Sequence, residues 1–416
     1  MQDFTYDEDF QKRLKTAILL FMIISAFTGF YSGVADLVMS NYFKDAYDAT
    51  ASQRGIIEIP RELPGIISLF VITSLSFLRD FRIAVVAQIF GAIGLVVLGV
   101  FHPSFGIMLI FLFVFSLGQH MFMPLGDSIG LSLATKDNLG RLLGQFKSVN
   151  MAFMMISGII CFFGFRSGFF HFEVPVLIFI ICAGCFLACA VLLLMMRAQI
   201  GKDLEGRTQV SKLVFRKEYA RYYVISAIYG SRKQIMFAFS PWVLIELLGF
   251  KADTMSLLGV IGAFIGIFFI PFIGKLTDRF GSKKVMMIEA LAFIALYIAY
   301  GVLSNWIVEE TVIFTGVMLF SVYVLFILDR MTTQFYMVRS IYLKAIAVKE
   351  EDVTPTLSTG LAIDHVFAVV LAFICGIIWD TYGPVYVFII AAILSATNFF
   401  VVMGIKKDTY VDKAAE

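Results

Sequence analysis

Two pairs of adjacent polar residues stand in the middle of long apolar segments of this sequence. They are Arg232-Lys233 and Asp364-His365. Counting about 1.5 Å per helical residue from the ends of their segments places both pairs near the middle of a bilayer. A charge in hydrocarbon costs about 2.5–3.5 kcal/mol, so charges that remain there usually face a bundle interior and serve a function. The two pairs are therefore the main candidates for a functional centre.

The cations of the first pair predict a site for an anionic group. Arg232 could supply two parallel hydrogen bonds, and Lys233 could supply a point charge. Tyr229 shares the helical stripe of Lys233, and Gln234 directly follows that lysine. The structural alternative is that Asp364 or another carboxylate neutralises the two cations.

The second pair predicts a group that binds and releases protons. A carboxyl such as Asp364 can exchange a proton when it is buried, and an imidazole such as that of His365 titrates near neutral pH. The alternative is an ion pair that ties this segment to a neighbouring one.

Three further polar side chains could form hydrogen bonds with a small solute. They are His120, Asn150 and Gln334. His120 lies about 15 residues into its segment, again near the middle of a bilayer. A lone histidine in an apolar helix is also compatible with a packing role.

Charges nearer the ends of the apolar segments predict two gates, in which ion pairs form in one state and break in another. The inner group carries both signs in each half of the chain: Asp127, Arg141 and Lys147, then Asp329, Arg330 and Arg339. The outer group comprises Asp36, Arg61 and Glu62, with Asp36–Arg61 as the expected pair. Simple anchoring of helix ends is the alternative, and we expect it for Arg141 and Arg339. Arg61 or Glu62 could instead be the first contact of a polar solute.

The composition identifies the kind of molecule that must position these residues. The chain has 416 residues, of which 60% are hydrophobic and 15% charged. Soluble domains are about 45–50% apolar and about 25% charged. The formal net charge of +2 offers no field to attract polyanions such as nucleic acids. The sequence therefore predicts a polytopic membrane protein embedded in a lipid bilayer.

Twelve apolar segments are long enough to cross about 30 Å of hydrocarbon as helices. They are residues 17–39, 56–78, 83–101, 105–134, 142–165, 174–196, 220–248, 254–277, 285–303, 312–337, 357–379 and 385–405. We expect two halves of six helices, residues 17–196 and 220–405, joined by a middle loop, residues 197–219. Residues 1–16 and 406–416 form the tails.

Lysine and arginine are concentrated on one side of these segments. The other side carries only Lys44, Arg54, Arg166 and Lys251. Cytoplasmic loops are the ones enriched in these residues. We therefore expect both termini and the middle loop in the cytoplasm, and the protein in the plasma membrane, which in bacteria is the inner membrane.

A basic motif with two glycines follows the eighth segment. Residues 274–284 read Gly-Lys-Leu-Thr-Asp-Arg-Phe-Gly-Ser-Lys-Lys. Gly274 would let two helices approach closely, and Asp278 could cap the following helix or pair with a cation. A weaker copy follows the second segment at residues 78–82. The remaining positions of the motif are Arg279, Gly281, Lys283 and Lys284.

This motif and the six-plus-six arrangement resemble the major facilitator superfamily. The resemblance implies an all-α membrane protein of twelve helices in two six-helix pseudo-repeats around a central cavity. It also implies secondary active transport. The first copy of the motif departs from the pattern, with Ser76 in place of glycine and Phe81 in place of arginine. The fifth segment lacks the Gly-Pro pair typical of drug–proton antiporters of the superfamily.

These observations together predict a transporter that moves a small polar, anionic solute by alternating access. The chain has no Gly-x-x-x-x-Gly-Lys-Ser/Thr loop, so we expect a proton as the coupling ion rather than ATP. We expect no cofactor, no metal site, no enzymatic activity and a monomer. The alternatives are an exporter of lipophilic drugs and a membrane receptor or scaffold without transport.

Overall fold

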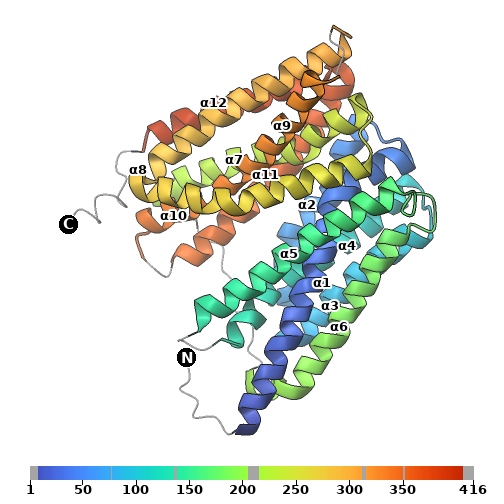
Figure 1. The fold of residues 1–416 in the computed structure, drawn as a ribbon. Helices are drawn as coiled ribbons and strands as arrows, with labels where there is room; N and C mark the ends of the chain where they lie inside the picture. The colour runs from blue at the N-terminus through green and yellow to red at the C-terminus, as the bar shows by residue number, and fades with distance from the viewer. Residues whose placement is uncertain are drawn as a thin grey trace. The chain divides into compact units, whose positions relative to one another are not determined.

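The computed structural model describes residues 8–75, 77–134, 138–204, 215–311, 315–349 and 352–405. The described residues form helices joined by short connections, without β-strands (Figure 1). The helices are α1 (Glu8–Tyr47), α2 (Ala51–Ser74), α3 (Asp80–Val100), α4 (Phe105–Ser132), α5 (Leu139–Arg166), α6 (Leu177–Leu204), η1 (Lys217–Tyr219), α7 (Ala220–Trp242), η2 (Val243–Leu247), α8 (Ala252–Val308), α9 (Val317–Thr332), η3 (Thr333–Phe335), α10 (Tyr336–Ile346), α11 (Val353–Tyr382) and α12 (Pro384–Met403).

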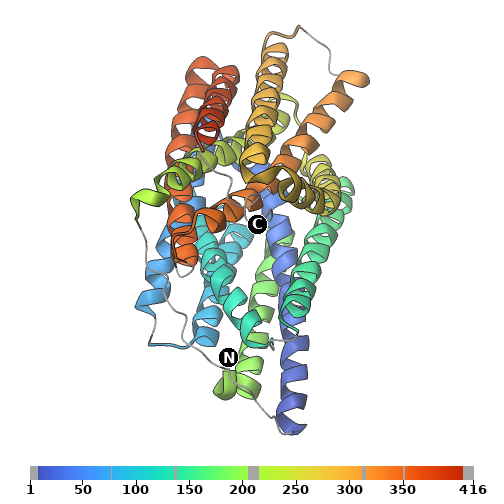
Figure 2. The same ribbon diagram turned by 90° about the vertical axis from the view of Figure 1, so that its left-hand side faces the viewer.

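These helices agree with the twelve predicted membrane spans. Within the described residues, nine helical stretches are long and apolar enough to cross a membrane, and one of them combines α9, η3 and α10. Another, α8, consists of two helices that meet at Gly281, which has a φ of 80°. Figure 1 and Figure 2 show the sharp bend between these two parts. The criterion leaves out α2 and α7, which carry the charged residues discussed below.

The bend at Gly281 falls inside the basic motif and explains one of its glycines. A positive φ is readily adopted only by glycine, so the chain can reverse there without a longer loop. The motif therefore forms a tight corner between two helices of α8. By contrast, a Cβ at Gly274 would meet no atom of the described residues within 4 Å, so this glycine marks no close helix contact among them.

The chain divides into two compact units. Unit 1 comprises Met1–Met39 and Leu63–Val210, and unit 2 comprises Ser40–Glu62 and Ser211–Glu416. The segment Ser40–Glu62, which contains the end of α1 and the start of α2, therefore belongs with the second half of the chain. The predicted division at the middle loop places this segment in the first half. Within unit 1, α3 packs against α4 and α6; within unit 2, α7 packs against α11, and α8 packs against α12.

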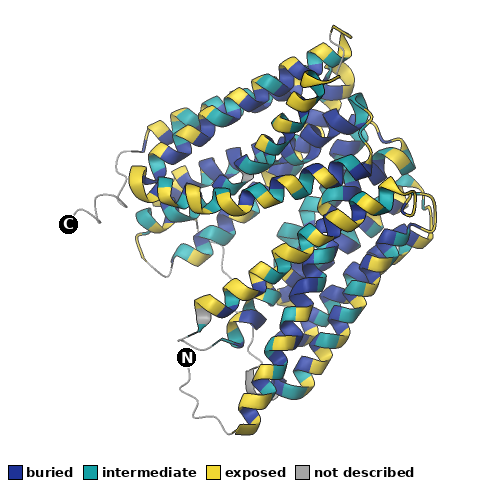
Figure 3. Cartoon of the chain, viewed as in Figure 1, coloured by how far each residue is buried: buried dark blue, intermediate teal, exposed yellow. Residues whose placement is uncertain are grey.

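Burial follows the pattern of a protein in lipid rather than in water. Large apolar side chains such as Phe70, Phe268 and Phe320 are mostly exposed on the helix surfaces (Figure 3). Charged side chains such as Arg232 and Glu58 are almost fully buried. Lipid tails are as apolar as the exposed residues, so only the polar groups need to be kept inside the protein.

Some predictions concern residues that the structure does not describe. The N-terminal residues 1–7, part of the middle loop (residues 205–214) and the C-terminal tail from residue 406 lie outside the described residues. The same holds for Ser76 in the first copy of the motif.

Candidate functional site

The start of α2 is fixed to α11 within unit 2. The Asp380 carboxylate accepts hydrogen bonds from the backbone N–H groups of Ala51 (3.2 Å) and Ser52 (2.9 Å), and it thereby caps α2. A Cβ at Gly376 would lie 2.6 Å from the carbonyl oxygen of Ala51, so the two helices touch through their backbones. This contact determines the position of the charged residues that follow on α2.

Four charged residues lie on one side of α2, because Glu58 is four positions from the first of them and three and four positions from the last two. They are Arg54, Glu58, Arg61 and Glu62. Glu58 is the centre of a hydrogen-bonded group and is 1% exposed. It accepts hydrogen bonds from Arg54, from Nη1 of Arg61 (2.7 Å) and from the Gln234 amide of α7. This carboxylate therefore binds three donors from two helices.

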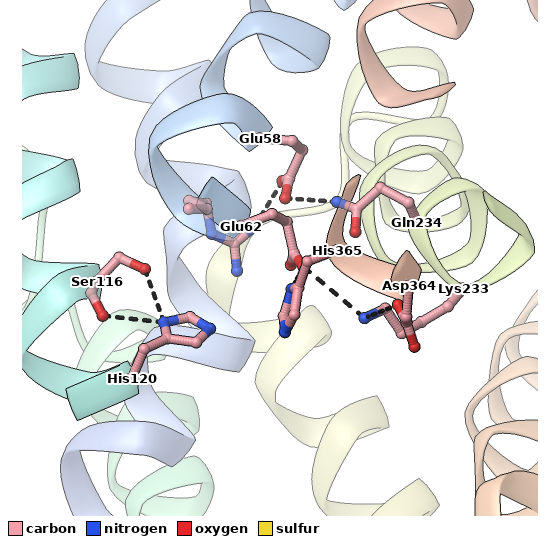
Figure 4. A network of polar contacts seen from close by, with 9 residues as sticks. Glu58, Glu62, Ser116, His120, Lys233, Gln234, Asp364 and His365 are labelled. Carbon is pink, nitrogen blue, oxygen red and sulfur yellow. Dashed lines mark hydrogen bonds and ion pairs between the residues drawn. The ribbon is translucent and has the colours of Figure 1, made fainter. Parts of the chain in front are cut away.

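The four residues Glu62, Lys233, Asp364 and His365 form a second group, which we call the proton cluster (Figure 4). The Lys233 ammonium lies 2.9 Å from the Asp364 carboxylate and 3.7 Å from that of Glu62. Nδ1 of His365 lies 2.8 Å from the same Glu62 carboxylate. The cluster connects α2, α7 and α11, and Lys233 and Glu62 remain 16% and 18% exposed.

The depth of Glu62 differs from the sequence-based expectation. We expected Glu62 near the outer face, whereas it contacts residues of the predicted mid-membrane pairs. The reason is the position at which α2 begins. Glu62 lies eleven residues after Ala51, which places it about 16 Å along the helix.

The two adjacent cations of α7 have different carboxylate partners. Arg232 points toward α8, where its Nη2 lies 2.8 Å from the Glu289 carboxylate, and both side chains are almost fully buried. Its guanidinium carbon lies 4.4 Å from the centre of the Phe293 ring. Successive residues on a helix point about 100° apart, so Arg232 and Lys233 cannot face the same neighbour.

Gly230 allows α7 to lie directly on α11. A Cβ at this position would overlap the backbone carbonyl group of Asp364. We expect Gly230→Ala to lower stability by about 1–3 kcal/mol, because the added methyl group must push the two helices apart. Thermal unfolding of the purified protein in detergent measures this effect.

Gly184→Ala is the matched control for this prediction, since Gly184 also lies within a helix and its Cβ would meet nothing within 4 Å. An unchanged melting temperature in Gly230→Ala, equal to that of the control, would contradict the close contact of α7 and α11.

The charges around Lys233 and Glu58 balance when His365 is neutral. The cations are Arg54, Arg61 and Lys233, and the carboxylates are those of Glu58, Glu62 and Asp364. One proton added to or removed from this set leaves it with a net charge in a mostly buried place. Such a charge is costly unless a mobile ion or solute compensates it.

Unit 1 contains a cavity of about 420 Å³. Polar side chains from α1, α4 and α5 line it: Ser25, Thr28, Ser32, Asp36, Gln119, His120, Asp127, Lys147 and Asn150. Phe21, Phe122 and Phe146 provide apolar walls. The cavity is large enough for a small organic molecule.

Two of the predicted solute-binding residues have defined positions in this cavity. Asn150 donates hydrogen bonds to the Ser25 carbonyl (3.2 Å) and to the Thr28 hydroxyl (3.0 Å). The His120 imidazole lies 2.9 Å from the carbonyl oxygen of Ser116, one helical turn earlier (Figure 4). Both residues therefore line the cavity, and both also contact other residues of unit 1.

The predicted gate residues are spread over both units. In unit 1, Asp36 lines the cavity, Arg141 is exposed, and Asp127 forms a largely exposed ion pair of 3.1 Å with Lys147. In unit 2, Arg61 binds Glu58, Asp329 is fully buried, and the Arg330 guanidinium lies over the rings of Phe237 and Phe326. Asp36 and Arg61 belong to different units, so their pairing stays a prediction.

The remaining predicted residues lie in η3 and in the basic motif. Gln334 lies in η3, where the tenth span is interrupted. Lys283 donates a hydrogen bond of 2.6 Å to the carbonyl oxygen of Ile405, and Arg279 lies over Phe280. Asp278 and Lys284 are exposed.

Two functional candidates were missed or misjudged in the sequence. Glu289 is a charged residue near the start of the ninth apolar segment, and the cost of burying a charge in hydrocarbon, which marked Arg232 as a candidate, applies to it as well. Arg339, expected as a helix-end anchor, is 5% exposed and lies against Tyr229 and Tyr336. Its low exposure could not be read from its position in the chain.

One of the comparisons with known proteins identifies a superfamily. A model of the Major Facilitator Superfamily matches residues 19–348. No curated protein sequence matches the chain.

Among solved structures, the nucleoside transporter NupG is similar with a TM-score of 0.73 and 14% identity, over 93% of this chain and 98% of that chain. A D-xylose-proton symporter gives a TM-score of 0.68 and 14% identity, over 94% and 98%. A POT family transporter in complex with a thioalcohol-conjugated peptide gives 0.69 and 12%, over 93% and 94%. At these identities the likeness concerns the fold alone.

Proposed function

This chain belongs to the Major Facilitator Superfamily, and we propose that it couples the movement of a small polar, anionic solute to the movement of protons by alternating access. Membership identifies an integral membrane transporter of small molecules rather than an enzyme. Our proposal adds two points to this membership: the coupling ion is a proton, and the solute is an anion.

The proton cluster is the observation that supports proton coupling. Lys233 lies between two carboxylates, and a proton on Asp364 or Glu62 would remove one of its partners. The ammonium would then be free to bind another anion. Protonation of the cluster and binding of an anionic solute would thus favour each other, which is the linkage that a symporter requires.

This scheme gives different roles to the two cations of α7. Lys233 is partly exposed and would bind the anionic group of the solute. Arg232 is buried against Glu289, so in our proposal it binds the solute only after this pair opens. Tyr229, Gln234 and Gln334 would shape the site on the side of unit 2, with His120 and Asn150 on the side of unit 1.

The gates and the orientation complete the proposal. Asp36 and Arg61 would close the outer side, and Asp127, Arg141, Asp329 and Arg330 the inner side. The termini would lie in the cytoplasm of a cell whose plasma membrane holds the protein as a monomer.

The cavity of unit 1 favours one other function, the export of lipophilic cations. It combines the Asp36 carboxylate with the rings of Phe21, Phe122 and Phe146. A negative charge among aromatic rings is a suitable binding site for a lipophilic cation.

A thermal-shift screen of the purified protein in detergent distinguishes the two functions. The compounds are small organic anions, nucleosides and sugars, and lipophilic cations. A ligand that binds only the folded state raises stability by about 2.7 kcal/mol at a hundredfold excess over Kd. We expect the anionic solute to stabilise the wild type and to lose most of this effect in Lys233→Ala. Stabilisation by lipophilic cations alone, equal in both proteins, would contradict the anionic solute and favour the exporter.

A further inference from the structure

Arg339 is a buried cation, and two of its three side-chain nitrogens form no hydrogen bond with the described residues. It lies on α10 and is 5% exposed. Its Nε and Nη2 atoms are buried without a hydrogen-bond acceptor among the described residues. The buried cations Arg54 and Arg232 also have two such nitrogens each, but a glutamate neutralises the charge of each of them. A buried charge without a partner is unstable unless something else neutralises it.

Two tyrosine rings hold the guanidinium in place. Its central carbon lies 3.3 Å from the ring centre of Tyr229 on α7 and 4.7 Å from that of Tyr336 on α10. Rings stabilise a guanidinium through its faces and leave the N–H donors at its edge available. Arg339 is therefore fixed in position while its hydrogen-bonding capacity remains open.

A small cavity lies beside this guanidinium and is lined mainly by donors. Its volume is about 10 Å³, which is room for one atom or ion of the size of water. Besides Arg339, its polar lining consists of Tyr222, Ser226, Tyr336, Ser340 and Asp364. Four of these five carry hydroxyl groups, which can all donate hydrogen bonds.

The cavity exists because residue 360 is a glycine. A Cβ there would overlap the Tyr222 ring and lie 3.0 Å from the Ser226 hydroxyl oxygen. Asp364 also faces the cavity, but Lys233 lies 2.9 Å from its carboxylate and compensates that charge. One cation therefore remains to neutralise an occupant.

We propose that Arg339 and the surrounding hydroxyl groups bind one monovalent anion, either an oxygen of a carboxylate or a chloride ion. A divalent phosphate or sulfate is disfavoured, because Arg339 is the one cation among the described residues that remains here and the second negative charge would be buried without a partner. The identification of the carboxylate with that of the transported solute rests on the proposed function, whereas the anion site itself does not.

Anion-dependent stability of the purified full-length protein tests the site. Melting temperatures are measured in detergent and chloride-free buffer with sodium chloride, sodium formate or sodium phosphate at constant ionic strength. We expect a saturable rise of a few degrees with chloride or formate and none with phosphate. If formate raises the melting temperature alone, or more than chloride does, the site binds a carboxylate. If chloride alone raises it, the site binds a halide.

Arg339→Gln should abolish the saturable rise. Arg216→Gln is the matched control, because it removes another arginine of unit 2 that has its own partner, Asp352, 3.2 Å away. If Arg339→Gln does not fold, Ser226→Ala with Ser340→Ala retains the cation and should raise the half-saturating anion concentration at least severalfold. The proposal would be overturned if the melting temperature of the wild type showed no saturable rise with either anion. It would also be overturned if the rise were equally large in Arg339→Gln, or if the serine variant had the same half-saturating anion concentration as the wild type.

The anion site and the proposed transport function can be tested independently of each other. Solute flux is measured independently in proteoliposomes. Saturable anion stabilisation without flux of any solute would retain the site and remove the transport proposal. If the protein showed proton-coupled flux but anions did not change its melting temperature, the transport proposal would stand and the anion site would be removed.

Discussion

Arg232→Ala lowers the free energy of unfolding by about 3–5 kcal/mol, because it leaves the Glu289 carboxylate buried without its partner. Both side chains of this pair are at most 2% exposed, and their atoms are 2.8 Å apart. The double variant Arg232→Met with Glu289→Leu should recover most of this loss, since it removes both charges and fills a similar volume. Unfolding of the single and double variants in detergent measures the coupling between the two sites.

The exposed pair of Lys251 and Asp45 provides the control for Arg232. Its atoms are 3.2 Å apart, but Lys251 is 70% exposed, so Lys251→Ala should change stability by less than about 1 kcal/mol. A double variant as unstable as Arg232→Ala would show that the pair is not the reason for the loss. A folded double variant that no longer binds the solute would show that Arg232 acts on the solute directly.

Asp364→Asn should abolish proton-driven accumulation of the solute and spare solute exchange. The amide cannot take up a proton in the relevant range, and it leaves Glu62, 3.7 Å away, as the acidic partner of Lys233. We expect the ratio of internal to external solute under a pH gradient to fall to about one. Exchange between labelled and unlabelled solute requires no net proton movement and should continue.

Asp45→Asn is the corresponding control, because it removes a carboxylate of the same unit from the exposed pair with Lys251. Its accumulation ratio should equal that of the wild type. Unchanged accumulation in Asp364→Asn would exclude this residue from the proton pathway. Loss of exchange together with accumulation would indicate that Asp364 is needed for solute movement as such.

Much of the helical framework could be predicted from the sequence, for a simple physical reason. Each span must satisfy its own backbone hydrogen bonds in lipid, so a long apolar stretch has one stable conformation. The predicted segments therefore match helices such as α3, α11 and α12 closely. The reversal within the basic motif depends on Gly281 alone, and its compactness was not visible in the sequence.

Pairings between helices were much harder to predict than the helices themselves. The position of Lys233 along α7 gives its depth, and the sequence offered the mid-depth carboxylate of Asp364 as an alternative partner, which lies 2.9 Å from the ammonium. The partner of Arg232 did not follow, because depth says nothing about which neighbour a helical face meets. Glu62 was placed too far outward because the start of α2 depends on its cap by Asp380, 328 residues away in the chain.

Simultaneous recording of solute uptake and internal pH in proteoliposomes tests proton coupling most directly. The probe is the organic anion that stabilises the purified protein most strongly. We predict that its uptake is accompanied by entry of protons, that an inward proton gradient drives accumulation, and that both effects disappear in Asp364→Asn. Uptake without a change in internal pH, with an accumulation ratio that does not respond when the proton gradient is collapsed, would contradict proton coupling through the cluster of Glu62, Lys233, Asp364 and His365.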